Sequence, residues 1–155
     1  MHKDEWKKEK KWRNVYTRSE KLRRARQLGM EYPRKSQREV MDGETINVLF
    51  VCSMNRWRSP TAEKVYEKRE MVNARSRGTS KKAVRTVAPS DLKWADVLLV
   101  MENKHREQLL SRFPGELKFV ELHVLDIPDD YRFMDEELVQ LLIETVDPLL
   151  GAWCL

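Results

Sequence analysis

A cysteine and an arginine separated by five residues, Cys52 and Arg58, have the types and the spacing to carry out a reaction on phosphate. A thiolate is a strong nucleophile, and a guanidinium can bind two phosphoryl oxygens at once through its planar fork. The backbone N–H groups of a loop that leads into a helix also converge on an anion. This spacing therefore predicts an anion pocket in which Cys52 attacks a phosphorus atom while Arg58 holds the phosphoryl oxygens.

The neighbouring residues predict the elements that position this pair. The apolar run 46–51 indicates a strand buried on both faces. Ser59 and Pro60 indicate the start of a helix, with Ser59 as its cap. The positive end of that helix favours the thiolate form of Cys52, and the Ser59 hydroxyl is expected to donate a hydrogen bond to the sulfur. The alternative is a structural cysteine beside a surface arginine.

The chain resembles the signature of the low-molecular-weight protein tyrosine phosphatases, and most closely their short bacterial members. The resemblance lies in residues 48–52, Asn55 and 58–60. The resemblance covers roughly residues 46–155. It implies a cysteine nucleophile, an arginine that binds phosphate and an asparagine that holds the shape of the loop. The residues of this loop that are expected to bind phosphate are Ser53, Met54, Asn55, Arg56, Trp57 and Ser59.

The chain departs from the usual pattern of this family in three places. Met54 stands where the family usually has glycine, and Trp57 stands where many members have a second cysteine. Without that second thiol, Cys52 is not expected to be protected as a disulfide. The basic segment 81–91 is shorter than the helical segment of typical members, which implies a more open wall around the site. Its positive charges either attract an anionic substrate or are simply solvated.

Three acids, Asp126, Asp129 and Asp130, follow the last expected strand. The carboxyl ends of parallel strands share one edge of a sheet, so these acids should lie near the loop that contains Cys52. A departing phenolate or alkoxide needs a proton, and a positioned acid typically contributes about 10²- to 10⁴-fold to the rate. Taken alone, the residues leave all three acids as candidates, or make them an acidic turn that caps the next helix. The resemblance implies Asp129 as the general acid, with Tyr131 lining the cleft.

The alternation of apolar runs with helical patterns predicts an α/β fold, a four-stranded parallel sheet with helices on both faces. The expected strands are 46–51, 73–76, 96–101 and 119–125. The expected helices are 59–71, 90–95, 102–113 and 135–150. Leu109, Leu110 and Phe113 are predicted to face the core, and Pro148 and Gly151 to end or bend the last helix.

The chain divides into a basic helical N-terminal extension, residues 1–45, and a phosphatase-like α/β domain, residues 46–155. The extension holds 14 Lys and Arg against 8 Asp and Glu, whereas the domain holds 16 against 17. One interpretation is that the extension contacts nucleic acid or another acidic partner. The other, which its interleaved acids favour, is a solvated helix that packs a thin apolar stripe on the domain.

Several classes of protein are disfavoured by composition. No apolar run is long enough to span a membrane, and the charged N-terminus lacks the apolar segment of a signal peptide. A reactive thiol needs a reducing compartment, so a cytoplasmic protein is expected. The three histidines and two cysteines lack metal-ligand spacing, so no metal or organic cofactor is expected. His105 and His123 are expected to be structural or solvent-facing.

These observations favour a cysteine-dependent phosphomonoester hydrolase that needs no cofactor and works through a cysteinyl-phosphate intermediate. The resemblance implies a protein tyrosine phosphatase, whose partner is a phosphorylated protein. One alternative keeps the mechanism but acts on phosphorylated nucleic-acid ends or nucleotides, delivered by the basic extension. Another is a non-catalytic module that uses the same pocket to bind phosphate.

Overall fold

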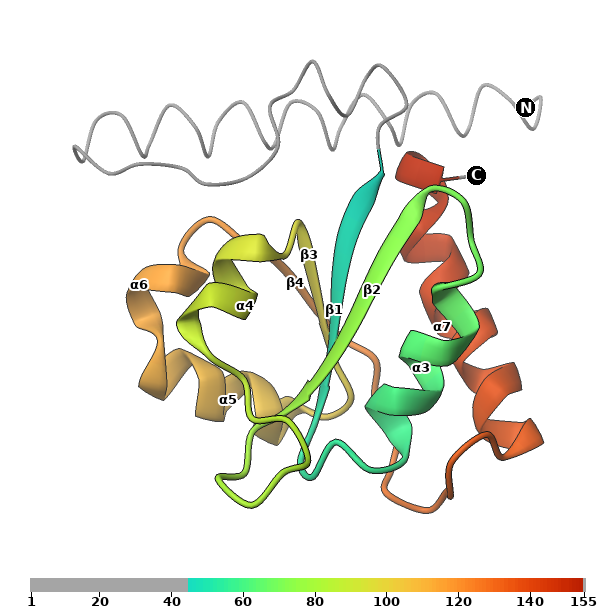
Figure 1. Ribbon diagram of the computed structural model, residues 1–155, viewed down its shortest axis with the longest axis horizontal. Coiled ribbons are helices and arrows are strands. Elements are labelled where there is room, and N and C mark those ends of the chain that lie inside the picture. The colour runs from blue at the N-terminus through green and yellow to red at the C-terminus, as the bar shows by residue number, and fades with distance from the viewer. Residues whose placement is uncertain (1–44, 155) are drawn as a thin grey trace.

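The computed structural model describes residues 45–154 of the chain (Figure 1). Side chains are described as far as Leu150. Residues 1–44, where the basic helical extension is predicted, and residue 155 lie outside the described part. The elements in chain order are β1 (Ile46–Cys52), α3 (Arg58–Tyr66), β2 (Val72–Gly78), α4 (Pro89–Trp94), β3 (Val97–Val100), α5 (Asn103–Arg112), α6 (Pro114–Leu117), β4 (Glu121–Val124) and α7 (Glu136–Cys154).

The four strands form one parallel sheet in the order β2-β1-β3-β4. Strand β1 lies inside the sheet, where Cys52 pairs with Gly78 of β2 and Val51 pairs with Val100 of β3. The chain leaves β1 toward one side of the sheet and later returns to β3 on the other side. Ligands of such sheets bind at this switch point, outside the carboxyl ends of the strands. The predicted α/β fold is confirmed.

Helices cover both faces of the sheet, because alternate residues of the central strands point to opposite sides (Figure 1). Val48, Phe50 and Cys52 of β1 belong to the core cluster beneath α3 and α7. Leu49 and Val51 belong to the second cluster, beneath α4, α5 and α6. Apart from Asn47 near the start of β1, both central strands are therefore apolar and buried, which is the expected pattern for a parallel sheet buried on two sides.

The helix after β1 differs from its prediction at both ends. It begins at Arg58, with Trp57 at the N-cap and no side-chain hydrogen bond there, so Ser59 is not the cap. The helix stops at Tyr66 instead of continuing to residue 71. Two tight turns follow, in which Arg69 N donates to Tyr66 O (3.0 Å) and Val72 N donates to Arg69 O (3.1 Å). These turns bring the chain directly to the start of β2.

The other helices correct two further expectations. Leu110 is exposed, because α5 buries only His105 and Leu109, one turn apart on the same side. Pro114 ends α5 but also begins α6. Helix α7 continues past Pro148, which lies on its exposed side, so the helix does not end there. None of the helices in the described range is long and apolar enough to cross a membrane.

Candidate active site

The loop between β1 and α3 consists of residues 52–58 and is hereafter called the Cys–Arg loop. The carbonyl groups of its first three residues point toward the 79–84 segment. The carbonyls of residues 52–54 accept hydrogen bonds from the N–H groups of Thr79, Ser80 and Val84, at 2.9, 3.0 and 3.0 Å. In a planar trans peptide, the N–H that follows each carbonyl points in the opposite direction. The N–H groups of residues 53–55 are therefore turned away from the 79–84 segment. A row of such donors forms a concave anion-binding site.

Gly78, the last residue of β2, allows the 79–84 segment to approach the Cys–Arg loop. A Cβ atom at this position would lie 2.5 Å from the Cβ of Ala83 and 2.6 Å from the carbonyl oxygen of Ser53. Both distances are far inside van der Waals contact. The outward carbonyls of the loop thus find their partners because this residue has no side chain.

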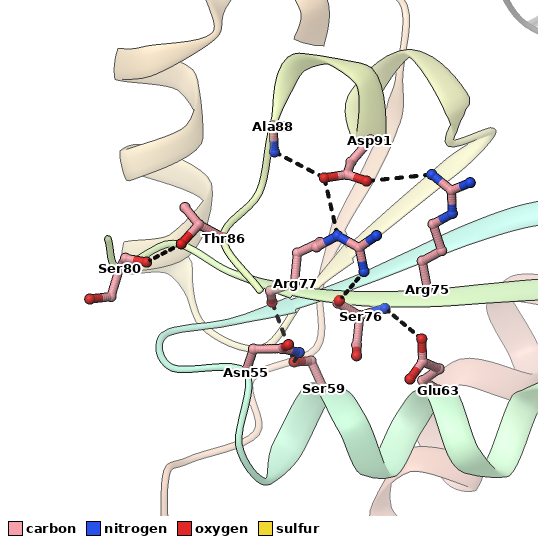
Figure 2. A network of polar contacts seen from close by, with 10 residues as sticks. All are labelled: Asn55, Ser59, Glu63, Arg75, Ser76, Arg77, Ser80, Thr86, Ala88 and Asp91. Carbon is pink, nitrogen blue, oxygen red and sulfur yellow. Dashed lines mark hydrogen bonds and ion pairs between the residues drawn. The ribbon is translucent and has the colours of Figure 1, made fainter. Parts of the chain in front are cut away.

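Asn55 and Ser59 brace the loop from behind (Figure 2). Asn55 has a left-handed backbone with φ of 55°, which asparagine tolerates better than most residues, and its Nδ2 donates to Ser59 Oγ at 2.9 Å. Ser59 Oγ lies 3.0 Å from Cys52 Sγ and 3.3 Å from the carbonyl oxygen of Arg77. The hydroxyl has a single proton. When Cys52 is a thiolate, its sulfur can only accept, so the shorter contact takes that proton and stabilises the anion.

The guanidinium of Arg58 is 2% exposed and is held from three sides. Its Nη1 donates to the carbonyl oxygen of Ile127 at 2.8 Å and lies 3.1 Å from Glu102 Oε2, while its Nε lies 3.6 Å from Asp129 Oδ1. Burial alone would raise the pKa of Glu102, but the positive charges of Arg58 and Lys104 beside it lower that pKa overall. Among the described residues, Nη2 of Arg58 has no protein partner, which leaves it available for a phosphoryl oxygen.

A hollow of about 100 Å³, hereafter the loop hollow, opens beside these groups. It brings together the three predicted catalytic residues, which come from β1, α3 and the segment after β4. Asp126 and Asp130 are exposed and do not line the hollow. The residues that line it are Cys52, Ser53, Met54, Arg56, Trp57, Arg58 and Asp129.

The expectation for Tyr131 is not met. Its side chain packs, half buried, against the core cluster beneath α3 and α7, and it is not among the residues that line the loop hollow. Burial and three nearby carboxylates, Glu137, Asp130 and Asp135, raise the pKa of its hydroxyl. Asp135 also caps α7, because its Oδ1 accepts a hydrogen bond from Glu137 N at 2.9 Å.

His105 is the site residue that sequence reasoning missed. It is fully buried on α5, its Nδ1 accepts a hydrogen bond from Glu102 N at 3.0 Å, and its Nε2 lies 2.8 Å from Ser53 Oγ. Burial and the charge of Arg58 lower the pKa of His105 to about 4, so it is neutral at pH 7. Since Nδ1 accepts, the ring proton is on Nε2 and is donated to Ser53. The sequence gives no local signal for a contact between residues 52 positions apart.

A buried carboxylate fixes the segment that supports the Cys–Arg loop (Figure 2). Asp91 at the start of α4 is 3.2 Å from Arg77 Nε and 3.4 Å from Arg75 Nη1, and it also accepts a hydrogen bond from Ala88 N at 3.0 Å. Asp91 therefore holds the segment 79–88 at both ends, through Arg77 just before the segment and through Ala88 at its last residue. The described residues contain no group of three or more His, Cys, Asp or Glu that could hold a metal ion.

Solved structures with the same architecture include several phosphatases. SP-PTP, the low molecular weight protein tyrosine phosphatase from Streptococcus pyogenes, superposes with a TM-score of 0.58 at 20% identity, covering 69% of this chain and 92% of that chain. The low molecular weight protein tyrosine phosphatase from T. tengcongensis gives 0.55 at 22% identity, covering 67% and 99%. This chain has the fold of the low-molecular-weight protein tyrosine phosphatases.

The same fold is found in an enzyme with a different stated substrate. YwlE arginine phosphatase from Geobacillus stearothermophilus superposes with a TM-score of 0.54 at 20% identity, covering 67% of this chain and 92% of that chain. No protein-family model and no curated protein sequence matches the chain.

The phosphatase fold accommodates both unusual residues of the Cys–Arg loop. The left-handed backbone occurs at Asn55 and not at Met54, so methionine is not forced into a conformation that favours glycine. Trp57 is 42% exposed and lies on the wall of the loop hollow without closing it. Neither departure from the family pattern blocks the approach to Cys52.

Proposed function

We propose that this protein is a cysteine-dependent protein tyrosine phosphatase. The observation that carries the proposal is the arrangement around one hollow of Cys52 Sγ, the turned N–H groups of residues 53–55, Arg58 and the carboxylate of Asp129. A nucleophile, an oxyanion site and a proton donor are the three components that phosphomonoester hydrolysis requires.

In the first step the Cys52 thiolate attacks phosphorus and forms an S–P bond while the P–O bond to the tyrosine breaks. Asp129 donates its proton to the departing oxygen, so tyrosine leaves neutral. Arg58 and the loop amides bind the equatorial oxygens, where charge develops in the transition state.

In the second step a water molecule attacks the cysteinyl-phosphate. Asp129, now ionised, accepts a proton from this water, and the S–P bond breaks to return the thiolate and release phosphate. Ser59 supports both steps, because its hydroxyl donates to the sulfur whenever the sulfur carries the charge. Glu102 keeps the buried Arg58 oriented throughout, through the 3.1 Å ion pair.

The substrate class needs a panel, because the fold is shared by a tyrosine and an arginine phosphatase. Full-length protein should be assayed with para-nitrophenyl phosphate, phosphotyrosine peptides, phosphoarginine peptides, nucleotides and phosphorylated RNA ends. We expect the highest kcat/KM with the phosphotyrosine peptides. A preference for RNA ends or nucleotides would favour the nucleic-acid alternative, and binding of phosphate without turnover of any substrate would favour a binding module.

The mechanism is tested by exchanging each of the two cysteines of the chain in turn. Cys52→Ser should abolish hydrolysis of para-nitrophenyl phosphate while the protein still binds phosphopeptide. Cys154→Ser is the matched control and should keep wild-type turnover. Full activity of the Cys52→Ser variant would eliminate the proposed mechanism.

A further inference from the structure

Exposed apolar side chains gather next to the loop hollow. Over the described residues, only five large apolar side chains are exposed, and single ones are ordinary on a protein surface. Three of them, Trp57 (42%), Val84 (66%) and Phe133 (50%), line the same depression of about 430 Å³. Apolar side chains concentrated in one hollow are a mark of a binding site. We call this depression the apolar groove.

The apolar groove adjoins the loop hollow. Arg56 and Trp57 line both, so these two side chains form a shared wall between them. Arg85 also lines the groove, and none of the residues that line the groove is acidic. The complete lining of the groove is Asn55, Arg56, Trp57, Pro60, Ser76, Val84, Arg85 and Phe133.

The walls of the groove are anchored to the catalytic elements. The backbone N–H of Val84 donates to Met54 O at 3.0 Å, which fixes one wall to the Cys–Arg loop. The N–H of Met134 donates to Thr61 Oγ1 at 2.9 Å, which fixes the residue after Phe133 to α3. The groove therefore has a defined position relative to Cys52. A site formed on such fixed elements can bind without first being ordered.

We propose that the apolar groove is a subsite for protein substrates, which takes an apolar side chain close in sequence to the phosphorylated residue within an acidic stretch. This rests on the proposed phosphatase function and assigns its substrates a local sequence. The apolar side chain fills the space between Trp57, Val84 and Phe133, and the acidic neighbours face Arg56 and Arg85. The two arginines disfavour the chain's own residues 1–44 as the occupant, because that segment holds 14 Lys and Arg against 8 Asp and Glu.

The test compares acidic phosphotyrosine peptides in which a single leucine is moved from three positions before to three positions after the phosphotyrosine. A peptide with serine in place of leucine is the reference, and para-nitrophenyl phosphate reports on the catalytic site alone. We expect wild-type kcat/KM to be about tenfold higher for at least one leucine peptide than for the serine peptide, as for a partly buried apolar side chain.

Full-length variants test whether the groove causes these preferences. The double variant Val84→Ser with Phe133→Ser should lose most of the roughly tenfold preference for leucine and keep its turnover of para-nitrophenyl phosphate. Leu110→Ser, which changes an exposed leucine on α5 outside the groove, should keep the preference. Arg85→Gln should reduce the advantage of acidic over neutral peptides.

Equal turnover of the leucine and serine peptides by wild type, or an unchanged preference in the double variant, would overturn the subsite. A change of oligomeric state in the double variant, measured by sedimentation velocity, would assign the groove to a second copy of the chain and also overturn it. If wild type hydrolyses no phosphate ester, the proposed function fails separately. Binding of the same peptides to the Cys52→Ser variant, measured by fluorescence anisotropy, then tests the subsite. Tighter binding of a leucine peptide than of the serine peptide supports the subsite, and equal binding rejects it.

Discussion

His105 Nε2 lies 2.8 Å from Ser53 Oγ, the hydroxyl of the residue that follows the proposed nucleophile. The histidine is fully buried, and its other nitrogen accepts the backbone N–H of Glu102, whose carboxylate pairs with Arg58. One short stretch at the start of α5 therefore contacts both ends of the Cys–Arg loop. Its position makes α5 a support for the loop and gives the buried histidine a positioning role.

Replacing His105 should lower turnover through the position of the loop. His105→Leu leaves the half-buried Ser53 hydroxyl without its donor, which we expect to reduce kcat about tenfold with a smaller change in KM. His105→Gln retains a donor and an acceptor and should restore most of the activity. Steady-state kinetics on para-nitrophenyl phosphate measure both values. Equal losses in the two variants would indicate that histidine only fills space.

The low pKa of His105, about 4, predicts how stability depends on pH. As pH falls below about 6.5, histidine in the unfolded chain binds a proton, whereas the buried ring stays neutral until about pH 4. The free energy of unfolding therefore falls by about 1.4 kcal/mol for each unit by which the pH drops in this window, or by roughly 3 kcal/mol in total.

Denaturant unfolding of wild type and His105→Gln between pH 7 and pH 4 measures this effect, because glutamine does not titrate. Glu102, whose pKa is lowered, adds a further loss only below its unfolded-state value, and it does so in both proteins. The difference between their pH slopes therefore reports on His105. Parallel curves for the two proteins would contradict the prediction.

Gly78→Ala should disturb the Cys–Arg loop. The added methyl group would lie 2.5 Å from the Cβ of Ala83 and 2.6 Å from the carbonyl oxygen of Ser53, so the 79–84 segment must move away from the loop. We expect a destabilisation of about 1–3 kcal/mol, as for an overpacked interior, together with reduced kcat.

Gly115→Ala is the matched control, because nothing lies within 4 Å of the Cβ position there. Alanine should be neutral or stabilise the short helix α6 by about 0.5–1 kcal/mol. Chemical denaturation and phosphatase assays compare the two variants directly. An equally harmless Gly78→Ala would mean that the loop does not depend on this close approach.

Asp129→Asn should slow substrates according to their leaving group. In kcat/KM, which reports on the first chemical step alone, phenyl phosphate, whose leaving oxygen needs a proton, should lose about 10²- to 10⁴-fold, whereas para-nitrophenyl phosphate should lose much less. Asp126→Asn and Asp130→Asn are controls, since neither residue lines the loop hollow. A loss in Asp126→Asn alone would move the acid to that residue.

Residues close in sequence determined much of the architecture and the first half of the site. The apolar runs of β1 and β3 define buried parallel strands, and a strand followed by Ser59-Pro60 defines a loop at a helix start. Cys52 and Arg58 belong to that one loop, so their spacing alone predicted that they would lie near each other. Periodicity and local turn chemistry are encoded within a few residues, which is why they can be inferred from one chain.

The tertiary structure decided which distant residues complete the site. The packed structure puts Asp129 on the wall of the loop hollow, where Asp126 and Asp130 do not lie. It also packs Tyr131 against the core cluster and brings His105 to Ser53. Leu110 was misplaced for a related reason, since the sequence cannot tell how wide a strip of α5 the sheet covers. Such contacts join residues far apart in the chain, and they follow from packing and register, which no local pattern specifies.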